Sequence, residues 1–159
     1  FIKAKSSQNR TELLECEGFD VLDDSYKSNP QSLQAGLETA YMLEGYKRKI
    51  VCLADMLELG EYSRLMHDQL GQYAAQMQVQ KLFCYGMMAD IVAEAAIKKG
   101  IRAENVYVCL DTRDAQGMAD MILQTLLPGD ILLVKASRAV QAERVIECMK
   151  KRRAKKKRI

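Results

Sequence analysis

The chain has 159 residues, 48% of them hydrophobic, and this length suits one domain with a substantial core, residues 1–159. It has no apolar run long enough to span a bilayer and no signal-peptide pattern, which favours a soluble, cytoplasmic protein over a membrane or secreted one. The five cysteines form no CxxC pair, so we expect neither a zinc site nor a disulfide framework. Phe1 in place of an initial Met suggests a processed chain or a fragment of a longer one.

Basic residues are concentrated at the C-terminal end. Of the 24 Lys and Arg residues, eight lie between Lys150 and Arg158, which leaves 16 basic residues against 21 acidic ones in the rest. Such a run can bind nucleic acid or an anionic membrane, but this one has no interleaved aromatic residues and lies at a terminus. We interpret residues 150–159 as a frayed, solvated helix end, and we expect neither a nucleic-acid nor a membrane partner.

The chain begins with a short hairpin pattern. Thr11 to Cys16 and Phe19 to Leu22 are prone to form strands, and Gly18 between them can supply the turn. We therefore expect a small N-terminal hairpin or antiparallel strand.

A polar segment, Asp23 to Asn29, follows the second of these strands. Asn29-Pro30 is a turn signal that also places proline at the first position of a helix. Adjacent carboxylates at the end of a strand suit a ligand with hydroxyl groups or a bound cation. The alternative is that Asp24 and Ser25 only cap the helix.

Apolar strands and amphipathic helices alternate through the rest of the chain. The strands are Lys49 to Leu53, Lys81 to Tyr85, Val106 to Leu110 and Ile131 to Val134. Helices follow at Tyr62 to Met77, at Met88 to Lys99, after a cap at Asp111, and through Met149. This alternation predicts an α/β fold, a Rossmann-like three-layer sandwich with a mostly parallel sheet and helices on both faces.

Loops at the carboxyl ends of such strands usually carry the function. The chain lacks both the GxGxxG fingerprint after its first strand and the GxxxxGK[ST] loop, so it cannot cradle a triphosphate alone. Lys135 to Arg138 places two cations and a hydroxyl where we expect a helix N-terminus, which favours an anion. The alternative is that Ser137 is only an N-cap. The sole histidine, His67, lies inside a helix without an evident paired acid, so we interpret it as structural.

Three motifs, in order, resemble the C-terminal domain of the Mur ligases: DDSYKSNP (23–30), ADMLELG (54–60) with His67 downstream, and LLVKASR (132–138). The segment Tyr26 to Pro30 is most similar to the member that adds D-alanyl-D-alanine to a UDP-linked muramoyl tripeptide. Lys27 and Ser28 depart from the family pattern, and Ala54 and Ala136 replace glycines.

The resemblance implies an ATP-dependent ligase of peptidoglycan synthesis. Its ATP and Mg²⁺ would be bound mainly by a preceding central ATPase domain, which follows an N-terminal UDP-binding domain. This domain would close on the nucleotide and position the amino substrate, with no catalytic residue and no metal ligand of its own. The isolated fragment is then expected to be inactive and to bind neither ATP nor Mg²⁺.

The resemblance also assigns residues. Those expected at the nucleotide are Arg10, Asp24, Tyr26 and Asn29. Those expected at the incoming dipeptide or the reacting phosphate are Lys135, Ser137 and Arg138. Three more match family positions without a firm role: Asp55, Glu58 and His67. The alternatives are a stand-alone Rossmann-like module that binds a nucleotide or small acid, or a domain of another Mur or folylpolyglutamate-type ligase.

Overall fold

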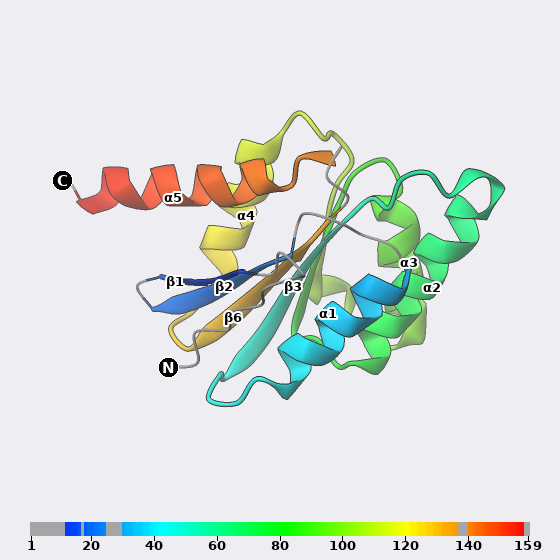
Figure 1. Cartoon of the computed structure of the whole chain (residues 1–159), viewed down its shortest axis with the longest axis horizontal. Coiled ribbons are helices and arrows are strands. Elements are labelled where there is room, and N and C mark those ends of the chain that lie inside the picture. The colour runs from blue at the N-terminus through cyan, green and yellow to red at the C-terminus, as the bar shows by residue number, and fades with distance from the viewer. Residues whose placement is uncertain (1–11, 17, 25–29, 137–139, 158–159) are drawn as a thin grey trace.

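The structure is a computed structural model that describes residues 12–16, 18–24, 30–136 and 140–157. Its centre is one six-stranded sheet with the strand order β1-β2-β6-β3-β4-β5 (Figure 1). The strands are β1 (Glu12–Glu15), β2 (Phe19–Asp24), β3 (Arg48–Ala54), β4 (Lys81–Tyr85), β5 (Val106–Cys109) and β6 (Asp130–Lys135). The α-helices are α1 (Pro30–Met42), α2 (Ser63–Gln76), α3 (Ala89–Lys99), α4 (Ala115–Thr125) and α5 (Glu143–Lys157). Short 3₁₀ turns, η1 (Gly60–Tyr62) and η2 (Ala103–Asn105), precede α2 and β5.

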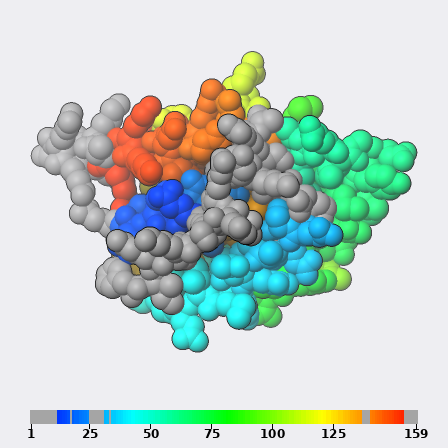
Figure 2. Space-filling view, in the orientation of Figure 1, coloured from blue at the N-terminus to red at the C-terminus, as the bar shows by residue number. Residues whose placement is uncertain are grey.

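The N-terminal hairpin is present as predicted. β1 pairs antiparallel with β2, and Gly18 has φ 89°, a left-handed value that glycine adopts without steric cost. All other strand pairs are parallel. Figure 2 shows the dark blue residues of β1 at the molecular surface, as expected for the strand at the edge of the sheet.

Helices cover both faces of the sheet, which confirms the three-layer prediction. Alternate strand residues such as Leu22, Leu53 and Leu133 join a core with α1, α2 and α3. Their neighbours Val21 and Cys52 join a second core with α4 and α5 on the opposite face (Figure 1). Because both faces are buried, the parallel strands carry continuous apolar runs. Among the helices that the structure describes, none has the length and apolar character needed to cross a membrane.

Two helix starts differ from the sequence predictions. The carboxylate of Asp114, not Asp111, caps α4 by accepting a hydrogen bond of 2.8 Å from Gly117 N. Asp111 instead accepts from Arg113 N, because it lies too far before the helix to reach the first turn. The helix α5 begins at Glu143, since Gln141 just before it has φ 55° and a left-handed residue cannot belong to a right-handed helix. Lys135 is the last residue of β6, and Ser137 and Arg138 of the predicted helix start lie outside the described residues.

The basic C-terminal segment is helical through Lys157. Arg152 forms an ion pair of 3.1 Å with Asp120 of α4, and the Arg153 guanidinium lies 4.1 Å from the centre of the Phe19 ring. These two cations are therefore held against the body of the domain.

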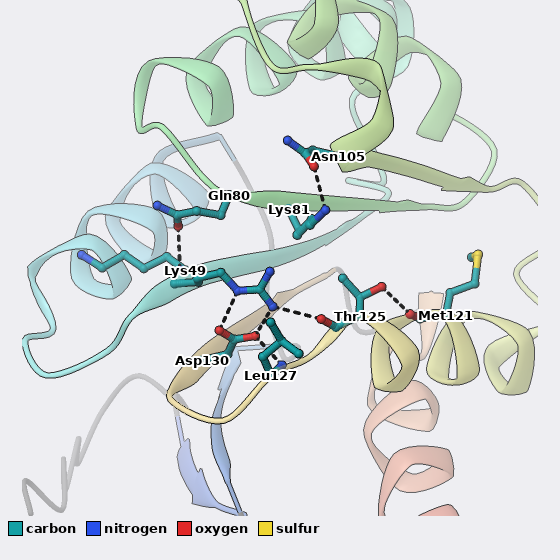
Figure 3. Close-up of polar contacts among 9 residues, drawn as sticks. Lys49, Gln80, Lys81, Asn105, Met121, Thr125, Leu127 and Asp130 are labelled. Atoms are coloured by element: carbon teal, nitrogen blue, oxygen red, sulfur yellow. Dashed lines mark hydrogen bonds and ion pairs between the residues drawn. The ribbon is translucent and has the colours of Figure 1, made fainter.

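At the amino-terminal edge of the sheet, the carboxylate of Asp130 in β6 contacts both β3 and the turn before β6 (Figure 3). Asp130 is 1% exposed. Its carboxylate accepts two hydrogen bonds from the Arg48 guanidinium, of 2.9 and 2.6 Å, and one of 2.7 Å from Leu127 N. The same guanidinium also donates to Thr125 O at 3.0 Å. This buried ion pair lies at the opposite end of β6 from the candidate site.

Candidate functional site

The sheet has a topological switch point at β6. This strand lies between β2 and β3, although it follows both in sequence. The chain leaves β2 toward α1 on one face and leaves β6 toward α5 on the other (Figure 1). In open α/β sheets, ligands bind outside the carboxyl ends of the strands where connections diverge in this way. The last residues of these two strands, Asp24 and Lys135, therefore mark the candidate site.

Asp24 and Lys135 form an ion pair. They are register partners across β2 and β6, so their side chains emerge on the same face of the sheet. Lys135 Nζ donates to Asp24 Oδ2 at 2.7 Å, and the two side chains are 2% and 14% exposed. The resemblance assigned Asp24 to the nucleotide and Lys135 to the incoming dipeptide or the reacting phosphate. The structure brings these two residues into direct contact.

Gly36 of α1 is a residue that the sequence analysis missed. A Cβ placed there would lie 3.0 Å from Asp24 Oδ2 and 3.7 Å from Lys135 Cδ. The missing side chain therefore lets α1 pass close over the ion pair. The available signal was a glycine inside an apolar helical pattern, where it disfavours the helix and needs another reason to be present.

Asp55, which had no assigned role, connects the loops after β3 and β4. It is 6% exposed, and its carboxylate accepts hydrogen bonds from Met87 N at 2.7 Å and Met88 N at 3.0 Å, at the start of α3. Gly86 makes this approach possible, since its φ is 124° and a Cβ there would lie 2.4 Å from the Asp55 carboxyl carbon. Asp55 thus satisfies backbone donors at a helix N-terminus.

His67 is fully buried in α2. Its Nε2 accepts a hydrogen bond from Met56 N at 3.0 Å, and its Nδ1 lies 2.7 Å from Ser63 O. Since Nε2 accepts, Nδ1 must carry the hydrogen that it donates to Ser63 O. Asp55 Oδ1 is 4.0 Å from Nε2, but the backbone donor already occupies that nitrogen. The imidazole therefore fixes the loop after β3 to α2.

Tyr85 at the end of β4 fixes a third loop of the same edge. Its hydroxyl donates to Thr112 O at 2.6 Å, between β5 and α4. Burial raises the pKa of Tyr85 to about 12, so the phenol keeps its proton at neutral pH and remains a donor. Three loops at the carboxyl edge are thus held by buried side chains.

The remaining predicted site residues are placed as follows. Glu58 is exposed and has φ 62°. Five lie outside the described residues: Arg10, Tyr26, Asn29, Ser137 and Arg138. Within residues 12–16, 18–24, 30–136 and 140–157, no group of three or more His, Cys, Asp or Glu side chains could hold a metal ion.

Fold and candidate site together define a Rossmann-like α/β domain whose sheet carries a buried ion pair at its carboxyl edge. The family model for the Mur ligase, glutamate ligase domain, matches residues 9–138. The chain therefore belongs to the Mur ligase family of ATP-dependent ligases, and the resemblance inferred from the three motifs is confirmed.

Individual relatives carry one recurring name, UDP-N-acetylmuramoyl-tripeptide--D-alanyl-D-alanine ligase. The protein of this name from Bacillus subtilis (strain 168) is 29% identical over 139 residues, which cover 87% of this chain and 30% of the relative. The one from Mycobacterium tuberculosis (strain ATCC 25618 / H37Rv) is 31% identical over 137 residues, covering 77% and 27%. The chain thus spans less than a third of the length of these relatives.

A solved structure supports the same relationship. The MurF ligase from Thermotoga maritima, in complex with ADP, superposes with a TM-score of 0.73 at 27% identity, covering 93% of this chain and 32% of that one. A MurF structure from Acinetobacter baumannii, at 22% identity and a TM-score of 0.75, supports the fold alone.

Proposed function

We propose that this chain is the C-terminal domain of a ligase that joins D-alanyl-D-alanine to UDP-N-acetylmuramoyl-tripeptide, a cytoplasmic step of peptidoglycan precursor synthesis. The main support is that relatives bearing this activity in their names align with 77% to 87% of the chain. They are about three times longer, which fits a domain that works with preceding ATPase and UDP-binding domains.

In this proposal the domain positions substrates rather than making bonds. ATP phosphorylates the terminal carboxylate of the tripeptide, and the dipeptide amine then displaces phosphate from the acyl phosphate. Asp24 would accept hydrogen bonds from the ribose hydroxyls, with Arg10, Tyr26 and Asn29 beside it. Ser137 and Arg138 would face the amino substrate. Closure of the domain would align the amine and exclude water.

Mg²⁺ would neutralise phosphate charge in the complete enzyme. The described residues contain no cluster that suits the ion, so its ligands are proposed to lie in the other domains. Asp55 and His67 would act by holding the carboxyl-edge loops, as their contacts indicate.

The test is phosphate release by the full-length protein. It should require ATP, the UDP-linked tripeptide and D-alanyl-D-alanine together. Failure to consume ATP when both acceptor and dipeptide are present would reject the assignment, and activity with a single amino acid instead would indicate another Mur-type ligase.

The stand-alone binding module makes the opposite prediction for the isolated chain. If the domain needs its neighbours for most phosphate contacts, the 159-residue chain alone should bind ATP weakly or not at all in calorimetry. Micromolar ATP affinity for the isolated chain would favour the module. A GxxxxGK[ST] loop encoded upstream of Phe1 would favour the ligase.

A further inference from the structure

The ion pair between Asp24 and Lys135 raises a question about the role of the lysine. The resemblance assigned Lys135 to the incoming dipeptide or the reacting phosphate, yet its side chain is only 2% exposed and its ammonium contacts Asp24 at 2.7 Å. Asp24, at 14%, is the more accessible member. The carboxylate is therefore better placed than the ammonium to meet a ligand.

We propose that Lys135 is a positioning residue for nucleotide recognition: it holds the Asp24 carboxylate in the orientation that receives the ribose of ATP. This inference rests on the proposed function and adds a role that differs from direct contact with the amino substrate. A buried ammonium needs a charged partner, and a carboxylate that accepts a hydrogen bond from a fixed ammonium is held in one orientation.

The packing around the pair supports this role. Asp24 and Lys135 are paired in register at the ends of adjacent strands, so the rigid sheet fixes both backbones. Gly36 of α1 packs against the ion pair, and a Cβ atom at this position would lie 3.0 Å from Asp24 Oδ2. The carboxylate is thus confined by the lysine on one side and by α1 on another.

The two roles of Lys135 predict different kinetics. If it positions Asp24, Lys135→Met in the full-length ligase should raise KM for ATP about tenfold, the cost expected for one charge-assisted contact, and leave KM for D-alanyl-D-alanine nearly unchanged. Lys135→Arg keeps the charge and should retain more of the ATP affinity. In an Asp24→Asn background, Lys135→Met should add little to KM for ATP, since both changes act through the same carboxylate.

An ATP analogue provides a readout that a merely structural role would not change. Removing the ribose 2′-hydroxyl, as in 2′-deoxy-ATP, should weaken binding to the wild type more than to Lys135→Met. Gly36→Ala tests the same geometry with both charges present, and it should raise KM for ATP severalfold by displacing Oδ2.

The matched control is Arg48→Met. It breaks the other ion pair of β6, at the amino-terminal edge, where Asp130 is 1% exposed. This control should lower thermal stability but leave both KM values unchanged. If Lys135→Met behaves like Arg48→Met, or raises KM for the dipeptide instead of ATP, the proposal is wrong.

The remaining outcomes are also decisive. Should Lys135→Met fail to fold, Lys135→Arg and Gly36→Ala take its place, and unchanged KM for ATP in both would overturn the inference. A wild-type enzyme that does not use ATP at all would reject the proposed function, and this inference with it.

Discussion

At the scale of single residues, His67 shows how a buried polar side chain stabilises a loop. Both ring nitrogens are used by backbone groups, Met56 N at 3.0 Å and Ser63 O at 2.7 Å. Buried backbone donors and acceptors need such partners, because water cannot replace them. The imidazole therefore supplies a hydrogen-bond acceptor to Met56 N, a backbone donor in the loop between β3 and α2 that no strand or helix satisfies.

His67→Leu should destabilise the protein by about 1–3 kcal/mol. Leucine is similar in size, so the loss comes from leaving Met56 N without its acceptor rather than from a cavity. Urea unfolding of the variant measures the change in the free energy of unfolding. Gln69→Leu, at an exposed position of the same helix, is the control and should change it by less than about 0.5 kcal/mol. Equal effects from the two variants would contradict this account.

The hydrogen-bond partners of His67 could not be predicted from the sequence. A lone histidine in an amphipathic helix, with no paired acid evident in the sequence, favours a structural role. The fold nevertheless places Asp55 Oδ1 4.0 Å from Nε2. The partners of the ring are backbone atoms, however, and their identity depends on how the loop meets the helix. The same limit applies to Asp24 and Lys135, which are 111 residues apart in sequence and meet only because β6 inserts beside β2.

At the scale of elements, local signals placed most of the predicted boundaries within two residues of those in the structure. The strand Lys81–Tyr85 and the helix start at Pro30 agree with the structure residue for residue. The start of α5 could not be predicted, since Gln141 is left-handed without a glycine to signal it. The order of the strands in the sheet could not be predicted from local sequence signals either, because it depends on which face of the sheet each connecting helix covers.

The contact between α2 and α3 depends on Gly71. A Cβ there would lie 2.2 Å from Val92 O and 2.9 Å from Ala95 Cβ, so the two helices pack almost backbone to backbone. Alanine favours a helix over glycine by about 1 kcal/mol, which by itself would stabilise α2. The clash is larger, so Gly71→Ala should instead destabilise the protein by about 1–3 kcal/mol.

Thermal or urea unfolding tests this prediction. Gln69→Ala lies on the exposed face of α2 and should leave stability unchanged or slightly raised, which separates helix propensity from packing. A Gly71→Ala variant as stable as the wild type would show that α2 and α3 can separate without cost.

At the scale of the whole molecule, burial in the core disfavours ionisation of the cysteine thiols. Cys52 and Cys84 lie on adjacent central strands, and neither is exposed. Burial raises the pKa of Cys52 to about 12 and also raises the pKa of Cys84. Tyr46 at the domain surface has its pKa raised to about 12 by burial and by its hydrogen bond to Asp20. The folded state thus keeps several protons that the unfolded chain releases in alkali.

The consequence is a loss of stability at alkaline pH. These groups have higher pKa values in the folded protein than in the unfolded chain. Their contribution to the free energy of unfolding is therefore complete below the unfolded pKa, about 8.5 for a thiol, and is lost as the pH rises toward the folded pKa. Between about pH 9 and pH 12, each fully buried thiol should lower the free energy of unfolding by about 1.4 kcal/mol per pH unit. Urea unfolding of the 159-residue chain under reducing conditions, from pH 7 to pH 10, measures this slope. Cys52→Ala removes one such proton and should give a shallower slope above pH 9 than the wild type. An unchanged slope would show that the Cys52 thiol ionises in the folded protein as readily as in the unfolded chain.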